Sequence, residues 1–322
     1  MSIKNLASIN QSFYKKDLIS IDQLDPLSIQ IIFRTTQHII DLLQKNEGGD
    51  ILKGVLATLL FFEPSSRTFS SFAAAIKRLG GVTVEYQNPT TTSSTVKGET
   101  LEDTVRVFEN YSDIIIMRHP MTGAPIRAAQ AAHAPVVNAG DGSGEHPTQA
   151  LLDMVTLFQR FGRVDHLKGV IAGDLLYGRT VHSLIKAFAM FEGNELYLLS
   201  PPELSLPPEL MKEFTKKGIK LTQLETEKEI PTDCQFWYWT RVQKERFSDI
   251  KEYERVKNRY VVTPELLKER GNKEMVIMHP LPRVGEIDNR IDSDPRALYL
   301  TNQVKNGMYI RMALIALIMG KL

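Results

Sequence analysis

The sequence contains one cysteine, Cys234, among 322 residues. An internal disulfide is therefore excluded, as is a zinc site built from four cysteines of this chain. So little cysteine is typical of a reducing compartment, and we expect a cytoplasmic protein. Because Cys234 directly precedes the largely aromatic stretch 235–239, we expect it to be a buried packing residue and not a nucleophile.

The chain also lacks an excess of either charge and any very long apolar run. Lys and Arg total 39, Asp and Glu total 38, and the net charge is +1. Nucleic-acid binders usually show a larger basic excess, so no nucleic-acid partner is expected. The apolar run 312–319 is far shorter than the roughly 20 residues that span a bilayer, and the first residues show no secretory signal. We expect a soluble protein with no membrane partner.

What the sequence does contain is an alternation of apolar, strand-length runs with helical periodicities. At roughly 150 residues per domain, the length favours two domains, and the alternation predicts that each is a parallel-sheet α/β sandwich. Strands are predicted at residues 55–62, 82–86, 113–117, 135–138, 170–172, 195–199, 236–240 and 276–278. Helices are predicted from Asp25-Pro26 to about residue 43 and at about 67–79, 100–110, 148–161, 180–191 and 302–319.

The helix that begins near Thr148 is the predicted connection between the two domains. We place the first domain at residues 1–149 and the second at residues 150–301. The closing helix is expected to return to the first domain, which therefore also includes residues 302–322.

Unusual polar residues follow the predicted strands, at the edge where parallel sheets bind ligands. The first group, Ser65-Ser66-Arg67-Thr68, lies between a strand and a helix N-terminus. Free N–H groups and the helix dipole attract an anion there, and three hydroxyls and a guanidinium add donors suited to phosphate. The alternative is simple N-capping, with Arg67 on the surface.

Two further candidates follow later strands of the first half. Arg118 ends a strand too apolar to be exposed, so it must either bind an anion or pair internally. His146 follows the glycine-rich loop 140–144, and a neutral imidazole could donate a hydrogen bond to a carbonyl group. Gln149 could help to position that carbonyl group. The alternative for His146 is a purely structural histidine.

The second half offers similar candidates. Arg179 lies at a helix start, where the dipole disfavours a cation, which suggests a function. Arg241 and Gln243 could together bind a carboxylate. The alternatives are a surface arginine and a solvated turn. Lys97, after the hydroxyl-rich loop 90–95, could close over an anion or belong to an exposed linker.

From the residues alone, the pattern predicts an enzyme that handles phosphate and carboxylate groups together. A P-loop is absent, so a nucleoside triphosphatase is not expected. The sequence has no clear metal-ligand cluster and no clear carboxylate general base. We therefore expect neither a metal nor another cofactor.

Six segments occur in an order that resembles the aspartate carbamoyltransferase family, within the aspartate/ornithine carbamoyltransferase superfamily. They are residues 62–68, 117–120, 146–149, 178–183, 240–246 and 279–283. The resemblance runs from about residue 12 to the end of the chain. The ornithine branch typically has His-Cys-Leu-Pro where this chain has His-Pro-Leu-Pro at 279–282, and it lacks the Arg-Val-Gln-Lys-Glu-Arg of 241–246. An arginine-rich pocket would also repel the cationic ornithine side chain, which favours aspartate.

The resemblance implies transfer of the carbamoyl group of carbamoyl phosphate to the amine of L-aspartate, the committed step of de novo pyrimidine synthesis. The products would be N-carbamoyl-L-aspartate and phosphate. The implied phosphate ligands are Ser65, Ser66, Arg67, Thr68 and Arg118. The implied contacts to the carbonyl oxygen are Thr68, Arg118 and His146. The carbamoyl amide would meet Gln149 and the backbone carbonyls of Pro280 and Leu281, and the aspartate would meet Lys97, Arg179, Arg241 and Gln243. The implied catalytic residues are Arg67, Thr68, Lys97, Arg118 and His146.

The resemblance also implies a homotrimer with shared active sites, since Ser93 and Lys97 match a loop that reaches the neighbouring subunit's site. A separate regulatory chain is compatible with it. Two positions depart from the family pattern. Ser66 stands where Thr or Gly is usual, and Val96 stands where a well-known bacterial relative has a second lysine. Two other functions remain open: an enzyme with another amine acceptor, such as ornithine, and a non-catalytic anion-binding paralogue with an assembly or regulatory role.

Overall fold

The chain divides into two compact units. The computed structural model describes residues 12–88, 98–244, 247, 249–257 and 259–322. Unit 1 comprises Met1–Val155 and Asn306–Leu322, and unit 2 comprises Thr156–Lys305. The two boundaries fall inside the helices α7 (Pro147–Phe161) and α12 (Asn302–Ile318). Most of the C-terminal helix therefore belongs to unit 1.

Unit 1 is built on a four-stranded parallel sheet in the order β2-β1-β3-β4. Its strands are β1 (Leu56–Phe61), β2 (Val82–Gln87), β3 (Ile114–His119) and β4 (Val136–Asp141). Besides its parts of α7 and α12, its helices are α2 (Pro26–Gln44), α3 (Ser66–Arg78), α5 (Leu101–Glu109) and α6 (Ala124–Ala131). The predicted start of α2 at Asp25-Pro26 is confirmed, and Asp25 is its N-cap, because the Asp25 carboxylate accepts the Ser28 N–H at 2.7 Å.

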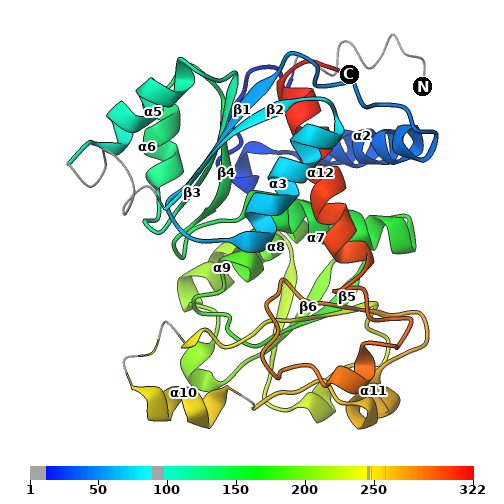
Figure 1. Cartoon of the computed structure of the whole chain (residues 1–322). Coiled ribbons are helices and arrows are strands. Elements are labelled where there is room, and N and C mark those ends of the chain that lie inside the picture. The colour runs from blue at the N-terminus through cyan, green and yellow to red at the C-terminus, as the bar shows by residue number, and fades with distance from the viewer. Residues whose placement is uncertain (1–11, 89–97, 245–246, 248, 258) are drawn as a thin grey trace. The chain divides into compact units, whose positions relative to one another are not determined.

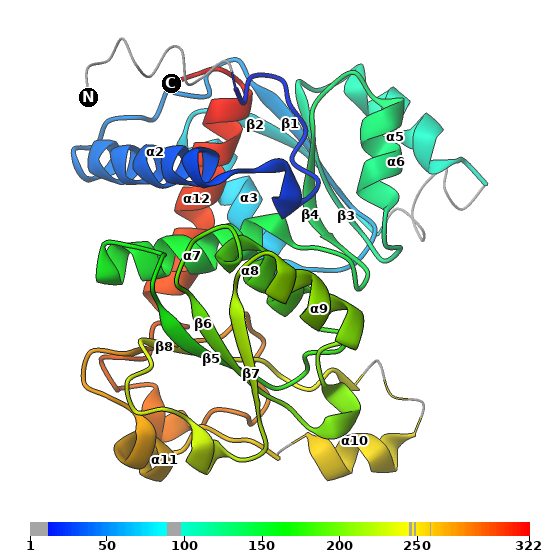
Figure 2. The same ribbon diagram turned by 180° about the vertical axis from the view of Figure 1, so that it is seen from behind.

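Helices cover both faces of this sheet. Helices α5 and α6 lie side by side on one face, and α3 and α12 lie on the other (Figures 1 and 2). Arg311 of α12 donates a hydrogen bond to Ser71 Oγ of α3 at 2.7 Å, and its guanidinium lies 4.8 Å from the centroid of the Phe72 ring. The C-terminal helix is thus anchored to the N-terminal half of the chain by a buried cation.

Unit 2 contains a five-stranded parallel sheet in the order β7-β6-β5-β8-β9. Its strands are β5 (Lys168–Ala172), β6 (Glu195–Leu199), β7 (Lys220–Leu224), β8 (Phe236–Trp239) and β9 (Val276–Met278). Its helices, beside its parts of α7 and α12, are α8 (Arg179–Phe188), α9 (Pro208–Lys216), α10 (Ile250–Val256) and α11 (Pro264–Arg270).

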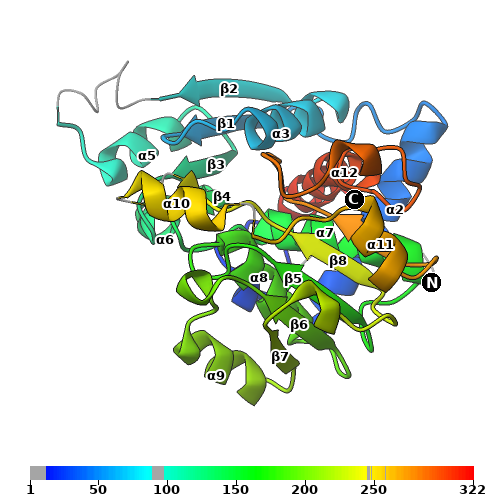
Figure 3. The same ribbon diagram turned by 90° about the horizontal axis from the view of Figure 1, so that it is seen from below.

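The core of unit 2 is organised around the aromatic strand β8, which is buried on both faces. Trp237 and Trp239 pack in one cluster with Leu267 of α11, which lies beside β8 (Figure 3). Phe236 points to the opposite face, where its ring stacks on Phe188 of α8 with a centroid separation of 5.3 Å. This two-sided burial explains why the strand is a continuous run of aromatic residues.

The predicted architecture is confirmed: both units are parallel-sheet α/β structures. The eight predicted strands are present as β1–β6, β8 and β9, whereas the sequence did not predict β7 or the helices α6, α9, α10 and α11. Cys234 is buried, as expected, and burial raises the pKa of its thiol to about 12. Among the described residues, no helix is long and apolar enough to cross a membrane.

One glycine in unit 2 is required by both its backbone and its surroundings. Gly173 follows β5 with φ of +112°, and a Cβ atom there would lie 2.1 Å from the carbonyl oxygen of Thr240, which follows β8. We expect Gly173→Ala to lower the free energy of unfolding of unit 2 by about 3 kcal/mol.

Chemical denaturation measures this effect. Gly218→Ala is the matched control, because Gly218 also has a positive φ of +96° but has no atom within 4 Å of the added Cβ. It should cost only about 1 kcal/mol, from backbone strain alone. Equal costs for the two variants would show that the close approach to Thr240 has no energetic consequence.

Candidate active site

In each unit, several of the predicted site residues lie near the carboxyl ends of the two strands between which the strand order reverses. The order reverses between β1 and β3 in unit 1 and between β5 and β8 in unit 2. Open parallel sheets bind ligands at such points. Residues 65–68 and Arg118 lie at the first reversal, and Arg179, Arg241 and Gln243 lie at the second.

Residues 65–68 form the junction between β1 and α3. Helix α3 begins at Ser66, and the side chain of the N-cap residue Ser65 makes no capping hydrogen bond. The first turn contains no acidic residue that would satisfy the helix dipole. Thr68 is buried and Arg67 is exposed. The simple N-capping alternative is therefore not realised through Ser65, and the junction keeps the properties of an anion site.

Arg118 is held at the end of β3 by partners on both neighbouring strands. Its Nη2 lies 2.7 Å from Glu63 Oε1, just after β1, and its Nη1 donates to the carbonyl oxygen of Ala139 in β4 at 3.2 Å. Arg118 is only 8% exposed. The internal salt bridge considered from the sequence is thus present, and it holds the guanidinium at the carboxyl edge of the sheet.

The loop from β4 to α7 carries His146, which lies directly before the helix and is 4% exposed. Asp141 braces this loop by accepting the N–H groups of Gly123 at 2.7 Å and Glu145 at 2.8 Å. Glu145 in turn accepts a hydrogen bond from Ser20 Oγ at 2.7 Å. These two carboxylates hold the loop that directly precedes His146, and the sequence did not single out either of them.

Gln149 is oriented by its neighbour one turn later in α7. Its Nε2 lies 3.0 Å and 3.2 Å from the two carboxylate oxygens of Asp153. A carboxylate accepts hydrogen bonds, so this contact fixes which end of the amide is nitrogen. The Oε1 atom of Gln149 receives no hydrogen bond from any residue the structure describes. It suits a ligand that presents an N–H group.

In unit 2 the loops after β5 and β8 are joined by hydrogen bonds. Gln243 Nε2 donates to the carbonyl oxygen of Tyr177 at 3.2 Å and to Asp174 Oδ2 at 3.3 Å. Asp174 Oδ1 accepts the Tyr177 N–H at 2.9 Å. Arg179 is the first residue of α8, and both Arg179 and Arg241 are half-buried. The structure therefore brings together the two loops that carry the predicted carboxylate-binding residues.

Asp174 is a fully buried carboxyl group whose role the sequence did not reveal. Burial raises its pKa above the ordinary value, against the opposing effect of hydrogen bonds from Tyr177 and Gln243. A group whose pKa is higher in the folded state stabilises the fold fully below its unfolded-state pKa. That stabilisation is lost as the pH rises through the folded-state pKa.

We therefore expect the stability of the wild type, relative to Asp174→Asn, to fall as the pH rises above about 4, the ordinary value for an aspartate, and through the raised folded-state pKa. The asparagine does not ionise, so it lacks this pH-dependent loss. Urea unfolding of both proteins at several pH values in this range measures the difference. A difference that does not change with pH would contradict the assigned direction of the pKa shift.

The remaining predicted residues fall into two groups. Pro280 and Leu281 lie in the turn after β9, separated from its end by His279, and β9 is the neighbour of β8 in the sheet. Ser93, Val96 and Lys97 lie outside the residues that the structure describes, so the predicted loop contribution stays a prediction.

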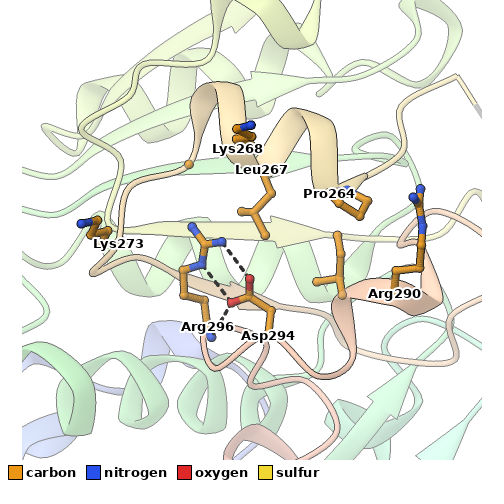
Figure 4. Close-up of a pocket in the computed structure, with 9 residues that line it drawn as sticks. Pro264, Leu267, Lys268, Lys273, Arg290, Asp294 and Arg296 are labelled. Carbon is orange, nitrogen blue, oxygen red and sulfur yellow. Dashed lines mark hydrogen bonds and ion pairs between the residues drawn. The ribbon is translucent and has the colours of Figure 1, made fainter.

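A pocket of about 340 Å³ in unit 2 is lined by none of the predicted site residues (Figure 4). Its lining includes Lys268, Lys273, Arg290 and Arg296. Arg296 is neutralised by Asp294, with Nη2 and Oδ2 2.8 Å apart. The positive charge at this pocket is thus partly neutralised. None of its lining residues belongs to the loops after β5 and β8, the strands between which the strand order reverses.

Comparison with known proteins assigns a domain family to each half of the chain. Residues 16–159 match the carbamoyl-P binding domain of the aspartate/ornithine carbamoyltransferases, and residues 165–318 match the Asp/Orn binding domain. The chain is 44% identical to the aspartate carbamoyltransferase catalytic subunit of Methanosarcina acetivorans, over 96% of this chain and 98% of that protein. It is 43% identical to multifunctional protein pyr1-3 of Dictyostelium discoideum, over 97% of this chain but only 14% of that much longer protein.

Solved structures are similar over nearly the whole chain. The catalytic subunit of M. Jannaschii aspartate transcarbamoylase gives a TM-score of 0.86 at 42% identity, covering 94% of this chain and 97% of that one. The Trypanosoma cruzi enzyme in complex with carbamoyl phosphate and aspartate gives a TM-score of 0.88 at 35% identity, covering 95% and 98%. Two family domains in sequence order and these full-length similarities lead to one assignment: the chain belongs to the aspartate/ornithine carbamoyltransferase family.

Proposed function

We propose that the chain transfers the carbamoyl group of carbamoyl phosphate to the α-amine of L-aspartate. The chain is an aspartate carbamoyltransferase, and its products are N-carbamoyl-L-aspartate and phosphate, as in the committed step of pyrimidine synthesis. The observation that carries the proposal is the placement of arginines beside the strand-order reversals of both sheets. Relatives that this chain resembles over nearly their whole length bear this activity in their names.

Carbamoyl phosphate is assigned to the edge of unit 1. The α3 N-terminus, with Ser65, Ser66, Arg67 and Thr68, binds the phosphate together with Arg118. The Arg118 guanidinium, the His146 imidazole and the Thr68 hydroxyl donate hydrogen bonds to the carbonyl oxygen. Gln149 Oε1 accepts a hydrogen bond from the carbamoyl amide, in agreement with its orientation by Asp153. The backbone carbonyls of Pro280 and Leu281 accept from the same amide.

L-Aspartate is assigned to Arg179, Arg241 and Gln243 of unit 2 and to Lys97. Two guanidinium groups suit a dicarboxylate, because charge-assisted hydrogen bonds from arginine to carboxylates are strong and directional. The same positive charge disfavours ornithine, whose side chain is a cation. Ser93 and Lys97 are proposed to act on the site of a neighbouring subunit.

In the proposed reaction, the neutral amine of aspartate attacks the carbonyl carbon and forms a C–N bond. The resulting tetrahedral oxyanion is stabilised by Arg118, His146 and Thr68. The C–O bond to phosphate then breaks, and the leaving phosphate accepts the proton of the amine. Positioning and electrostatic stabilisation therefore carry the catalysis, without a dedicated carboxylate base.

Several further assignments belong to the proposal. The functional domains are residues 1–149 with 302–322, and residues 150–301. The chain forms a homotrimer with shared sites and is compatible with a separate regulatory chain. Its location is cytoplasmic, although one relative, from Pisum sativum, is named as chloroplastic. Analytical ultracentrifugation tests the trimer, because a monomer at working concentration would leave the shared sites incomplete.

The decisive experiment offers the purified chain carbamoyl phosphate with aspartate or ornithine in parallel. Carbamoyl-aspartate formed from aspartate alone is the expected result. Turnover of ornithine would overturn the acceptor assignment, which rests on Arg179 and Arg241. No product from either acceptor, with a folded trimer, would favour the non-catalytic paralogue.

A further inference from the structure

A buried pair of titratable side chains lies beneath the turn that follows β9. His279 Nε2 and Glu286 Oε1 are 2.6 Å apart, and their side chains are 0% and 4% exposed. The proposed mechanism gives neither side chain a role. A buried charge is costly unless several hydrogen bonds satisfy it, so the partners of this pair indicate what it holds in place.

The hydrogen bonds of His279 define its protonation. Its Nδ1 lies 2.7 Å from the backbone nitrogen of Leu281. A backbone N–H can only donate, so Nδ1 must be the acceptor and the ring proton must sit on Nε2. The Nε2–H then donates to Glu286. His279 is therefore a neutral ring in a single tautomer.

The second oxygen of Glu286 holds the far end of the same turn. Its Oε2 accepts the N–H of Val284 at 3.0 Å. Burial raises the pKa of Glu286, but the interactions with His279 and the backbone hydrogen bonds, including the one from Val284, together outweigh burial, and the net pKa lies below the ordinary value. One ionised carboxylate thus holds the backbone N–H of Val284 by a direct hydrogen bond and that of Leu281 through His279.

The backbone between these anchors is strained and presents acceptors. Leu281 has φ of +56°, a conformation that a branched residue adopts only when its surroundings enforce it. Within the described part of the chain, no group donates a hydrogen bond to the carbonyl oxygens of Pro280 or Leu281. These are the two carbonyls that the proposed function assigns to the carbamoyl amide.

We propose that Glu286 is a positioning residue that selects for the carbamoyl amide: it locks the His279 tautomer, and the locked turn presents the Pro280 and Leu281 carbonyl oxygens to the N–H groups of the substrate. The inference rests on the proposed function. It adds that recognition of the –NH2 group, as opposed to the phosphate, depends on Glu286.

Glu286→Gln tests the inference without changing the size of the side chain. If the amide oxygen of the glutamine accepts the hydrogen bond from His279, its –NH2 group faces the Val284 N–H, and two donors cannot form a hydrogen bond. If the –NH2 group instead donates to His279 Nε2, the ring proton moves to Nδ1 and faces the Leu281 N–H, which is also a donor. One anchor of the turn is lost in either orientation. Glu286→Asp retains the charge and should partly restore function.

The readout compares carbamoyl phosphate with acetyl phosphate, which has a methyl group in place of the –NH2 group. Glu286→Gln should raise the KM for carbamoyl phosphate about tenfold. The inhibition constants of acetyl phosphate and inorganic phosphate, and the KM for aspartate, should change less than twofold. Asp294→Asn is the matched control, since it removes the same charge from the same unit at the ion pair with Arg296 (Figure 4). It should leave all four constants unchanged.

The outcomes separate this inference from the proposed function. An inactive wild type would contradict the proposed function itself. An active wild type whose Glu286→Gln variant weakens both acyl phosphates equally, or neither, would overturn the positioning role alone. Nitrogen-15 NMR of the wild-type histidines gives a second test that needs no variant, should Glu286→Gln fail to fold. The Nε2–H tautomer is expected for His279, and a protonated Nδ1 would overturn the inference.

Discussion

Arg118→Ala is expected to lower kcat/KM for carbamoyl phosphate by about 10³-fold. The variant removes a nearly buried guanidinium whose Glu63 and Ala139 contacts hold it at the carboxyl end of β3. Loss of one oxyanion donor typically costs about 10² to 10³ in kcat, and the proposed phosphate contact is lost as well. Steady-state kinetics with saturating aspartate measure the effect.

Two controls make this result specific. Arg127→Ala removes an exposed arginine of the same unit, paired with Glu102 at 2.7 Å, and should change kcat/KM less than twofold. Because Arg118→Ala leaves the Glu63 carboxylate without its partner, the double variant with Glu63→Gln separates that effect from the loss of the donor. If the double variant recovered most of the activity, Arg118 would be a structural residue.

Arg241→Ala is expected to raise the KM for aspartate by about 100-fold. A charge-assisted hydrogen bond is worth about 1.5–3 kcal/mol, and the bidentate geometry of arginine places the loss near the upper end. The KM for carbamoyl phosphate should stay within about threefold of the wild-type value, because the proposed phosphate ligands are in unit 1.

Initial-rate measurements with each substrate varied in turn distinguish these constants. Arg255→Ala is the matched control, since this exposed arginine of unit 2 pairs with Glu203 at 3.2 Å and should have no effect on either constant. An equal rise of both KM values in Arg241→Ala would point to a general loss of structure, and the assignment of the aspartate carboxylates to Arg241 would then be wrong.

The sequence predicted well those elements whose signal is local. Strand β8 is a continuous aromatic run, and β1 is an apolar run interrupted only by Thr58. The side chain of Asp25 marks the helix start at Asp25-Pro26. In contrast, β7 is a short, half-exposed edge strand, Lys220–Leu224, whose mixed composition does not distinguish it from a loop. Strand β7 is defined by its pairing with β6, which single-chain periodicity does not reveal.

The candidate site shows the same division. Residues at the end of a strand or in the segment that follows it, such as Arg118 at the end of β3 and Arg179 at the start of α8, could be identified from their order alone, because the carboxyl ends of parallel strands meet at one edge. The groups that orient them could not. Glu145 meets Ser20 across 125 residues of sequence, and Gln243 meets Asp174 across 69. Such partners come together only when the chain folds, and the local sequence around Glu145 or Asp174 does not indicate them.

The division of unit 1 between the two ends of the sequence has a consequence for the order of assembly. Arg311 joins Ser71 across 240 residues, and residues 306–322 are synthesised only after every residue of unit 2. This contact closes a long loop, which carries an entropic cost, and it cannot form before the last helix has been synthesised. During translation, unit 2 should therefore be able to fold before unit 1, whose last helix has not yet been synthesised. Damage to unit 2 would then delay both units, whereas damage to α12 would spare unit 2.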